Sequence, residues 1–429
     1  MFEPTGSRRD AASVIFNLPG YRVIDAADLP LGGRRIKIQP VDLVAGCPRC
    51  GVLSTRVHGW VQQRIRDIPH AGHVAVVVRK PRLVCAAPAC PRRTFTPATE
   101  QLPLRARCTT RLKTALLEAV IDSGRAVAEV AADYRVAWWT VQATVNTAAL
   151  LLAEVDQLPV LRLGIDEHRY RRVRWFRHED GGWRRVEPWM STIVNADTGQ
   201  VLGIVDGRDS TAVGGWLAAR SPAWRNRIQV VAIDPSAAFK KAILQQLPNA
   251  KISVDPFHLV QLANLMVTRV RQRLVREREQ RRGRKIDPAW AHRTLLLRGY
   301  DTLSARGRAR LQMVFDIDDP TEELSAAWGV KEQLRRLLKV ATLEQARHQK
   351  MILGCYMLAA DMDETWRLWH TIDTWWPEIE VLITHRVTNA RTEAANTDIK
   401  HIKRTGRGYR NPAHYQARIL LTSAARRAA

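Results

Sequence analysis

Residues 227–248 read RIQVVAIDPSAAFKKAILQQLP, in which an uncharged apolar run ends at Asp234 and passes at once into a helical pattern. Residues 250–270, AKISVDPFHLVQLANLMVTRV, repeat this order of strand and helix. Short buried strands that alternate with helices are typical of a parallel or mixed sheet flanked by helices. In open sheets of this kind, ligands gather at the carboxyl ends of the strands. We therefore expect Asp234 to lie at a functional edge of a sheet.

Three earlier segments extend the predicted sheet. Each reads as a strand, and turn residues at 180–182 and 197–199 mark two hairpins, which together predict a three-stranded meander. Asp166 then lies on the first strand and Asp234 at the end of the fourth, so the two carboxylates can be neighbours. The three segments are LRLGIDEHRY (161–170), EPWMSTIVNADTG (187–199) and QVLGIVDGRD (200–209).

A third acid, Glu393, stands early in the helical pattern NARTEAANTDIKHIKR (389–404). The stretch between Asp234 and Glu393 is too long for one loop, so we expect a helical insertion. Its arginine-rich part, Arg269 to Lys285, predicts a phosphate track because no acidic run balances it. Two uses remain open for four tryptophans near its end, which either stack an unpaired base or fill a hydrophobic core. These are Trp366, Trp369, Trp375 and Trp376.

Asp166, Asp234 and Glu393 together predict a site for two divalent cations. Mg2+ or Mn2+ prefers oxygen ligands, and substrate phosphates complete the coordination, so a few converging carboxylates suffice. A pair of such ions promotes in-line phosphoryl transfer. The alternative is that the aspartates merely end strands and that Glu393 is a solvated helix residue. The nearest substitutes, Glu167, Asp398 and Glu378, are expected to face elsewhere.

Composition supports a polyanionic partner. The chain of 429 residues has 67 Lys plus Arg against 42 Asp plus Glu, a net charge of +25. This excess predicts a nucleic acid partner, and the length predicts several domains. No apolar run is long enough to span a bilayer, and the N-terminal MFEPTGSRRDAASV has no long apolar core of a signal peptide. We therefore expect a cytoplasmic, nucleoid-associated protein without a membrane partner.

Four cysteines predict a structural Zn2+ site. Cys47 and Cys50 form a C-x2-C pair, and Cys85 and Cys90 form a C-x4-C pair. Each pair places two thiolates on a tight turn, as tetrahedral zinc requires. The intervening residues alternate in polarity and break at 69–72, which predicts a β-hairpin. Four unrelated cysteines are the alternative, and three nearby histidines, His58, His70 and His73, are spare ligand candidates.

Residues 109–155 have the spacing of a helix-turn-helix. Three helical patterns follow one another, with a break at Gly124, and Val127, Ala131, Val136 and Val141 supply apolar contacts. The third helix would enter a DNA major groove, where Gln and Asn side chains read base edges and arginines neutralise phosphates. Two adjacent tryptophans either face the DNA or pack against a neighbouring domain. The predicted contacts are Arg125, Arg135, Trp138, Trp139, Gln142 and Asn146.

At these residues the chain resembles the bacterial insertion-sequence transposases of the ISL-three type. The motifs that carry the resemblance are CPRC, the later C-x4-C with PRRTF, GIDEH, VVAIDPS, DPFH and NARTEAANTDIKHIKRTGRGYRN. The resemblance implies a multidomain α+β protein with a zinc-ribbon-like knuckle, a helix-turn-helix and an RNase H-like α/β core that a long helical insertion interrupts. It implies a DDE transposase that binds terminal inverted repeats and catalyses metal-dependent cleavage and strand transfer.

By this resemblance, Asp166, Asp234 and Glu393 bind Mg2+, the four cysteines bind Zn2+, and Asp255 and His258 lie near the catalytic site. His258 either bonds a catalytic carboxylate or contacts the cleaved strand, while the alternative is a helix cap by Asp255 and a histidine without a role. Cations on and after the helix of Glu393, namely Lys400, Lys403, Arg404 and Arg407, would hold phosphate. The expected domains are 1–103, 104–156, 157–262, 263–385 and 386–429.

Two rival functions remain open. One is a DNA-binding regulator in which the core is only a scaffold, and the other is an RNase H-like nuclease that cuts branched DNA without joining it. A transposase holds two transposon ends and a target duplex, so the DDE interpretation also predicts a homodimer or higher oligomer on double-stranded DNA.

Overall fold

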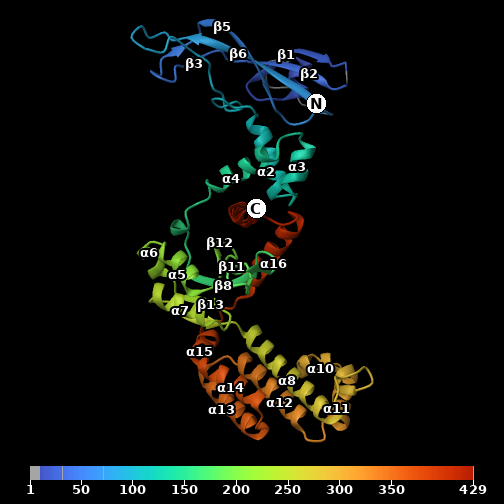
Figure 1. Ribbon diagram of the computed structural model, residues 1–429. Helices are drawn as coiled ribbons and strands as arrows, with labels where there is room; N and C mark the ends of the chain where they lie inside the picture. Colours follow the sequence, from blue (N-terminus) through green and yellow to red (C-terminus); the bar gives the residue numbers. More distant parts are fainter. Residues whose placement is uncertain (1–9, 31, 71, 429) are drawn as a thin grey trace, which may run out of the picture. The chain divides into compact units, whose positions relative to one another are not determined.

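The computed structural model describes residues 10–30, 32–70 and 72–428, so the expectation about a signal peptide lies in part outside the described residues (Figure 1). The chain forms two compact units. The first comprises Met1–Leu152 and Ile402–Ala425, and the second comprises Ala153–His401 and Arg426–Ala429. No helix in the described part of the chain is long and apolar enough to cross a membrane.

The first unit begins with a sheet of strand order β1-β2-β6-β5, in which β7 pairs with the end of β6. The hairpin expected between the cysteine pairs is confirmed as antiparallel β5 and β6. The helix α1 and strands β1 and β2 were not predicted, and they join this hairpin because β2 pairs in parallel with β6. The elements are α1 (Ala11–Phe16), β1 (Tyr21–Asp28), β2 (Arg34–Pro40), β3 (Ala45–Gly46), β4 (Leu53–Ser54), β5 (Val57–Ile65), β6 (Val74–Val84) and β7 (Thr94–Phe95).

Three helices follow in the first unit, as the sequence predicts: α2 (Thr110–Ile121), α3 (Val127–Asp133) and α4 (Trp138–Ala149). Thr109 caps α2, and Gly124 adopts a φ of +68° at the turn after it. A fourth helix, α17 (Pro412–Ala428), contributes Leu421 to the same apolar cluster. The final predicted domain, 386–429, is therefore divided, because α17 packs in the first unit.

The second unit contains a five-stranded mixed sheet of order β12-β11-β8-β13-β14. Strands β8, β11 and β12 form the predicted antiparallel meander, and β13 and β14 add in parallel to β8. The turn predicted at 180–182 joins β9 to β10, which form a separate two-stranded hairpin. The strands are β8 (Arg162–Arg169), β9 (Arg174–Arg177), β10 (Trp183–Val186), β11 (Trp189–Asn195), β12 (Val201–Asp206), β13 (Val230–Ile233) and β14 (Lys251–Val254).

Helices surround this sheet and share its apolar core. The helices before β14 are η1 (Val155–Gln157), α5 (Ser210–Ala218), α6 (Pro222–Arg227) and α7 (Ala237–Gln246). Leu163, Ile165 and Ile233 of the strands are fully buried among them. After the sheet, α16 (Ala390–Thr405) carries Glu393 back to it. Ser236 caps α7 directly after β13, which fixes the strand-to-helix turn at Asp234.

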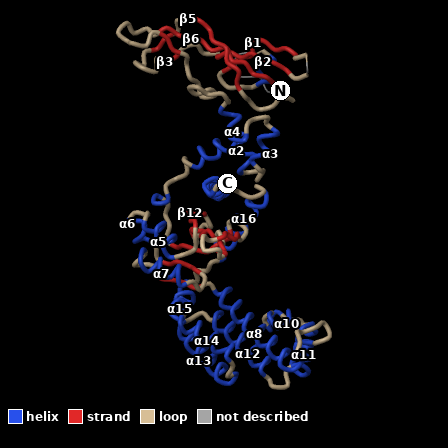
Figure 2. Tube along the Cα trace, viewed as in Figure 1, coloured by secondary structure: helices blue, strands red, loops and turns tan. Residues whose placement is uncertain are grey.

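The chain between β14 and α16 is helical throughout (Figure 2). Its first helix, α8, starts at Pro256 under an Asp255 cap and buries Leu259, Ala263 and Val270 at helical spacing. The elements are α8 (Pro256–Glu279), α9 (Pro288–Ala291), α10 (Arg293–Leu297), η2 (Tyr300–Thr302), α11 (Ala305–Asp318), α12 (Glu323–Lys339), α13 (Leu343–Ala360), α14 (Asp363–Thr374) and α15 (Trp376–His385).

Acids of other helices pair with two arginines at the end of α8, although no acidic run in the sequence balances this stretch. The Arg273 guanidinium lies 2.9 Å from a Glu364 oxygen, and the Arg278 guanidinium lies 2.6 Å from an Asp318 oxygen. These acids are distant in sequence, which is why a linear charge pattern did not reveal them. The arginines stabilise helix packing here.

The tryptophans of the helical segment mainly fill its core. Trp375 is buried, and Trp369 and Trp376 pack partly buried against the main apolar cluster. Trp366 is more exposed, and its indole N–H donates to Asp361 over 3.1 Å. Of the two uses left open by the sequence, the core is the one that these contacts support.

Candidate active site

Two aspartates lie at matching positions on neighbouring parallel strands, Asp166 within β8 and Asp234 directly after β13. Ile165 of β8 and Ile233 of β13 are register partners, so Asp166 and Asp234 are the next residues on adjacent strands. Burial, and after it the charge of Asp234, raises the pKa of Asp166 to about 6. The strand arrangement therefore brings the first two predicted acids into electrostatic contact.

Helix α16 is tied to both aspartates by asparagine side chains. The Asn389 amide donates to Asp234 Oδ1 over 3.1 Å and to the Ile165 carbonyl over 3.1 Å. One turn beyond Glu393, the Asn396 amide donates to Asp166 Oδ2 over 2.7 Å. Both asparagines are buried. The helix that carries the third acid thus fixes the positions of the first two.

A series of hydrogen-bonded side chains orients Asn396. The Thr192 hydroxyl donates to Asn396 Oδ1 over 2.7 Å, and His168 Nδ1 lies 2.9 Å from the same hydroxyl oxygen. Because the hydroxyl hydrogen is used for Asn396, His168 Nδ1 must donate to Thr192. All three side chains are buried. These hydrogen bonds hold Asn396 Oδ1 toward Thr192 and so direct the NH2 group of Asn396 toward Asp166.

The sheet and α16 approach each other closely at Gly164. A Cβ atom built at this position would lie 2.0 Å from Thr392 Oγ1 and 3.0 Å from Asn389 Oδ1. Such distances are far inside van der Waals contact, so only glycine allows α16 to lie this close to β8.

Asp255 and His258 join the site from the start of α8. His258 Nε2 lies 2.9 Å from Asp234 Oδ2, and His258 Nδ1 lies 3.4 Å from Asp255 Oδ2. Asp255 also caps α8 and accepts the Asn389 backbone N–H over 3.0 Å. Both interpretations of Asp255 therefore hold, because the helix cap is also a partner of His258. Hydrogen bonds to Asp234 and then to Asp255 raise the pKa of His258 to about 10.

Glu393 lies on the same side of α16 as the asparagines. One potential ligand atom from each of Glu393, Asp255 and His258 lies within 4.8 Å of the others. Burial raises the pKa of Glu393, and the charges of Asp255 and then Asp234 add to this effect. The third acid therefore lies beside Asp255 and His258, although it comes from a segment far along the chain.

The donor set suits a hard divalent cation. Four carboxylates gather at one sheet edge, and their mutual repulsion contributes to the raised pKa values of Asp166 and Glu393. Protonated His258 is the cation that partly compensates this charge. Oxygen-rich sites of this kind bind Mg2+ or Mn2+.

The residues expected to face elsewhere have other partners. Asp398 pairs with Arg426, and Glu378 lies 2.5 Å from Lys240 Nζ. Glu167 is 3.3 Å from Arg208, but its pKa is raised first by burial and also by the charge of Asp234. Glu167 consequently stays within electrostatic reach of the site, closer than strand alternation alone suggested.

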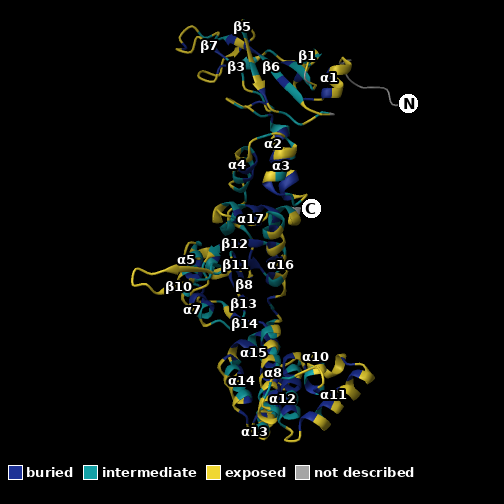
Figure 3. Ribbon diagram, turned by 45° about the vertical axis from the view of Figure 1, so that its right-hand side comes forward, coloured by how far each residue is buried: buried dark blue, intermediate teal, exposed yellow. Residues whose placement is uncertain are grey.

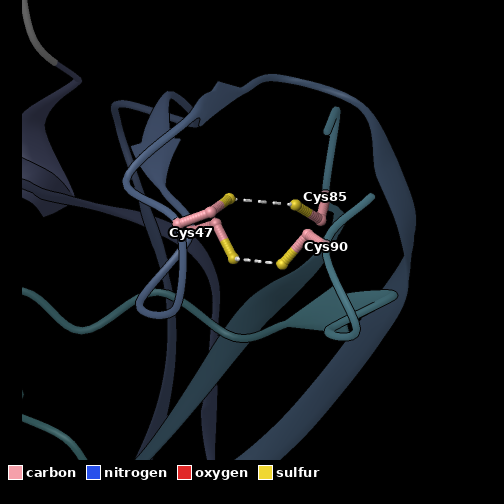
Figure 4. Close-up of side chains that lie close together, drawn as sticks. Cys47, Cys85 and Cys90 are labelled. Atoms are coloured by element: carbon pink, nitrogen blue, oxygen red, sulfur yellow. Dashed lines mark hydrogen bonds between the residues drawn. The ribbon is translucent and has the colours of Figure 1, made fainter. Parts of the chain in front are cut away.

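The four cysteines form one cluster in the first unit, and their sulfur atoms all lie within 4.8 Å of one another (Figure 4). The Cys47 and Cys90 sulfurs are 4.0 Å apart, and the Cys50 and Cys85 sulfurs are 3.5 Å apart. Tetrahedral zinc with bonds of about 2.3 Å requires sulfur separations of about 3.8 Å. The cluster therefore fits structural zinc, and His58, His70 and His73 do not belong to it.

Electrostatics of the cysteine cluster favour a bound cation. Burial opposes the thiolate of Cys47, but the backbone N–H groups of Arg49 and Cys50 outweigh burial and lower its pKa to about 6. The N–H of Ala87 favours a thiolate at Cys85, yet burial and the neighbouring sulfurs raise that pKa to about 12. Four thiolates together thus require a positive ion between them.

The helix-turn-helix residues do not all lie as predicted. Trp138 and Trp139 are exposed at the start of α4, and both contact the ring of His414 in α17. The expectation that Gln142 faces outward is wrong, because it is 2% exposed and its amide donates to Asn146 over 2.8 Å. Gln142 lies on the helical stripe of Val141 and Val145, both of which are buried.

The predicted phosphate-binding cations differ in their surroundings. Arg125 pairs with Asp133, and Arg407 lies 2.7 Å from Glu129, so the acids of α3 meet both charges. Arg135 adopts a left-handed φ of +50° in the turn between α3 and α4. On α16, Lys400 and Arg404 are exposed and Lys403 is half-buried. The charge of Lys400 reaches Glu393 and opposes the rise of its pKa.

Comparison with known families decides the identity of the chain. The model described as a transposase of the ISL3 type, in the DDE class, matches residues 163–419, which is more than half of the 429 residues. The chain belongs to the ISL3 transposase family. The family's helix-turn-helix model matches residues 97–149, and the zinc-finger model of the transposases of IS204, IS1001, IS1096 and IS1165 matches residues 44–90.

Relatives of this ISL3 transposase agree with that assignment. It is 24% identical over 403 residues to the transposase for insertion sequence element IS1001 of Bordetella parapertussis, and the match covers 90% of each chain. It is 26% identical over 332 residues to the transposase for element IS1557 of Mycobacterium tuberculosis, covering 72% of this chain and 70% of that one. The Drosophila P element transposase strand transfer complex covers 73% of this chain and 91% of its own at 7% identity, but its TM-score of 0.39 supports no argument.

Sequence reasoning missed the residues that position the acids of this transposase. Asn389, Glu393 and Asn396 have spacings of four and three residues, which place them on one face of a helix. This regular spacing of amides around an acid was the available signal. The role of Thr192 had no such signal, because its partner Asn396 is 204 residues away.

Proposed function

We propose that this ISL3 transposase binds the terminal inverted repeats of its insertion sequence and catalyses metal-dependent cleavage and strand transfer. The proposal rests on one helical segment that carries Glu393 and forms hydrogen bonds with both Asp166 and Asp234. Asn389, the residue before α16, holds Asp234, Asn396 of α16 holds Asp166, and Glu393 lies between the two asparagines in sequence. This arrangement concentrates negative charge at the carboxyl edge of the sheet, where phosphoryl transfer chemistry needs cations.

The strand order supports an RNase H-like core. An antiparallel meander of three strands is extended by two parallel strands, each followed by a helix. Asp166 lies in the first strand of this sheet and Asp234 directly follows the fourth. The helical segment α8 to α15 would then be the insertion that separates Glu393 from the other acids in sequence.

Asp166, Asp234 and Glu393 would hold the divalent cations. Such cations, Mg2+ or Mn2+, activate the attacking water or 3′-hydroxyl when bound and stabilise the leaving oxygen. The protein contributes positioning. Hydrogen bonds from Asn389 and Asn396 restrict the carboxylate rotamers, and this preorganisation lowers the cost of assembling the reactive geometry.

His258 would serve the same site as a resident cation. Its ring bridges Asp234 and Asp255, and its raised pKa keeps it protonated near neutral pH. A protonated imidazole at this position can contact a scissile phosphate or balance the carboxylates before metal arrives.

DNA recognition would belong to the first unit. The helix-turn-helix and the zinc cluster lie there, and a groove of about 540 Å3 is lined by Arg64, Arg66 and Arg107 of the sheet and its connection to α2, together with the start of α4. Three guanidinium groups in one groove suit a DNA backbone. Because two transposon ends must be held together, we expect a dimer or higher oligomer on DNA.

The decisive experiment replaces Asp234 by Asn in the full chain. We expect Asp234→Asn to retain binding to DNA that carries the flanking ends of the element, while Mg2+-dependent cleavage falls at least about 10²-fold, the scale of losing one charge-stabilising group. Asp398→Asn is the matched control, because this acid on α16 pairs with Arg426 and should leave cleavage unchanged.

Two assays separate the outcomes. Gel shift with end DNA measures binding, and incubation with a target plasmid distinguishes joined products from cut products alone. Loss of binding with cleavage kept in Asp234→Asn would contradict the assignment. Cleavage by the wild-type chain without any joined product would favour a nuclease instead.

A further inference from the structure

A two-stranded hairpin, β9 and β10, leaves the central sheet beside the candidate active site. Figure 3 shows it as an exposed ribbon projecting from the second unit. Its base is the register pair of Arg169 and Trp189, and Asp166 lies three residues earlier on β8. Three strand residues correspond to about 10 Å, so the hairpin starts close to the acids.

The hairpin exposes large aromatic side chains. Trp175 is 58% exposed, Phe176 is 50% exposed and Trp183 is 66% exposed. Exposed tryptophans are costly in water, so several in one short element indicate a binding surface. The tryptophans of α14 and α15, in contrast, lie mostly within the core. Phe257, Tyr300 and Trp366 are single exposed aromatic residues on other elements of the second unit, whereas the hairpin gathers three on one short element.

The pairing register places two tryptophans and two arginines on one face. Trp175 is opposite Arg185, and Arg177 is opposite Trp183. Directly opposite residues on an antiparallel pair share a face, and residues two apart on one strand also share it. Trp and Arg therefore alternate in both directions across this surface, which we call the Trp–Arg face. Phe176 lies on the reverse face.

The charge of the hairpin selects a polyanion. Residues 171–186 contain six Arg and two acidic residues, so their net charge is 6 − 2 = +4. Among the residues that the structure describes, Arg177 of the Trp–Arg face and Arg174 and Arg184 of the reverse face form no ion pair, whereas Arg185 of the Trp–Arg face pairs with Glu187. Two copies of this surface would repel each other, which disfavours self-association through the hairpin.

We propose that the Trp–Arg face holds unpaired nucleotides of the DNA strand beside the active site. Bases of an intact duplex are already stacked, so exposed indole rings gain a partner only where bases are unpaired. Guanidinium groups between the rings would neutralise the adjoining phosphates. This proposal rests on the proposed function, because it requires DNA at the acids.

Geometry limits which nucleotides can reach the hairpin. Three more residues separate Trp189 from Val186, so the four-residue strands lie about 20 to 33 Å along the chain from Asp166. At about 3.4 Å per nucleotide, a strand that leaves the active site meets the Trp–Arg face within about ten nucleotides. The unpaired segment would consequently lie at or next to the end being processed.

The test compares DNA binding by the full chain with and without the two tryptophans. The probes are a blunt duplex, the same duplex with a 3′ extension of about ten nucleotides, and that extension made abasic. We expect the wild-type chain to bind the extended duplex more tightly than the blunt one. Loss of stacking in Trp175→Ala with Trp183→Ala should reduce this preference about 5- to 150-fold.

Two further variants serve as controls. Trp175→Phe with Trp183→Phe keeps aromatic rings and should retain most of the preference, and Phe176→Ala on the reverse face should retain it fully. An unchanged preference in the double alanine variant would overturn the proposal. Equal binding of the abasic extension, or loss of preference in Phe176→Ala, would also overturn it.

The remaining outcomes distinguish DNA from a second copy of the chain as the partner of the hairpin. If the double alanine variant changes only the oligomeric state of the protein, and not its DNA preference, the hairpin is a contact between copies and the proposal fails. Blunt-duplex binding and Mg2+-dependent cleavage by the wild-type chain test the proposed function independently, because neither requires the Trp–Arg face.

Discussion

Gly164→Ala should disable the site without removing any predicted ligand. A Cβ at position 164 would lie 2.0 Å from Thr392 Oγ1, whereas nonbonded heavy atoms prefer about 3.5 Å or more. The start of α16 must therefore retreat by more than about 1 Å. Because Asn389 and Asn396 of this region hold Asp234 and Asp166, the displacement separates the acids from one another.

The expected magnitude follows from this displacement. Overpacking of a tight core costs about 1–3 kcal/mol in the free energy of unfolding. A misplacement of about 1 Å at a reactive centre lowers the rate about 10²-fold, which corresponds to about 2.7 kcal/mol of activation free energy. Strand cleavage should consequently fall about 10²-fold while end binding by the first unit is kept.

Rescue and control variants identify the cause. The Thr392 hydroxyl is buried without a hydrogen-bond partner among the described residues, so Thr392→Ala removes the clashing atom at small cost. Adding it to Gly164→Ala should restore part of the cleavage, because only the smaller overlap with Asn389 Oδ1 at 3.0 Å remains. Gly59→Ala is the control, since nothing lies within 4 Å of its Cβ position. Urea unfolding and cleavage rates measure both effects. A Gly164→Ala chain with wild-type stability and cleavage would refute the close packing of α16 on β8.

Two other predictions concern the metal-binding clusters. Cys90→Ser should lower bound zinc from one ion per chain toward zero and loosen the first unit, whereas Cys108→Ser, outside the cluster, should keep one ion by metal analysis. In the metal-free chain, the NMR signal of His258 should titrate near pH 10, because hydrogen bonds to Asp234 and Asp255 raise its pKa above the ordinary 6.5. The stability from this interaction is full below about pH 6.5 and is lost as the pH rises through about 10. Asp234→Asn should shift the titration toward neutral pH, and an unchanged titration would contradict the contact.

Local patterns predicted the parts of the fold that depend on local physics. The alternation in 161–209 and the strand-to-helix turns at Asp234 and Asp255 are visible in short windows, and the structure confirms them. The strand Tyr21–Asp28 was missed because half of its residues are Asp or Ala, which favour strands weakly. It is a strand because it pairs with β2, which in turn pairs with β6.

Side-chain partnerships across the chain were harder to predict. The exposure of Gln142 was misjudged because a polar residue was assumed to avoid the apolar stripe that contains Val141 and Val145. The balancing of Arg273 depends on Glu323 and Glu364, which are 50 and 91 residues away. Charge patterns along a sequence cannot reveal such pairs, since only the packing of helices brings them together.

The last part of the chain completes both compact units. Helix α16 supplies the asparagines that order the acids, and α17 supplies Leu421 to the apolar cluster of the three helices near residue 120. During synthesis on the ribosome, neither unit can finish folding until these residues have emerged. A chain that stops short of residue 389 would keep Asp166 and Asp234 but lose the helix that holds them. Premature termination would therefore release a product in which Asp166 and Asp234 lack their asparagine partners.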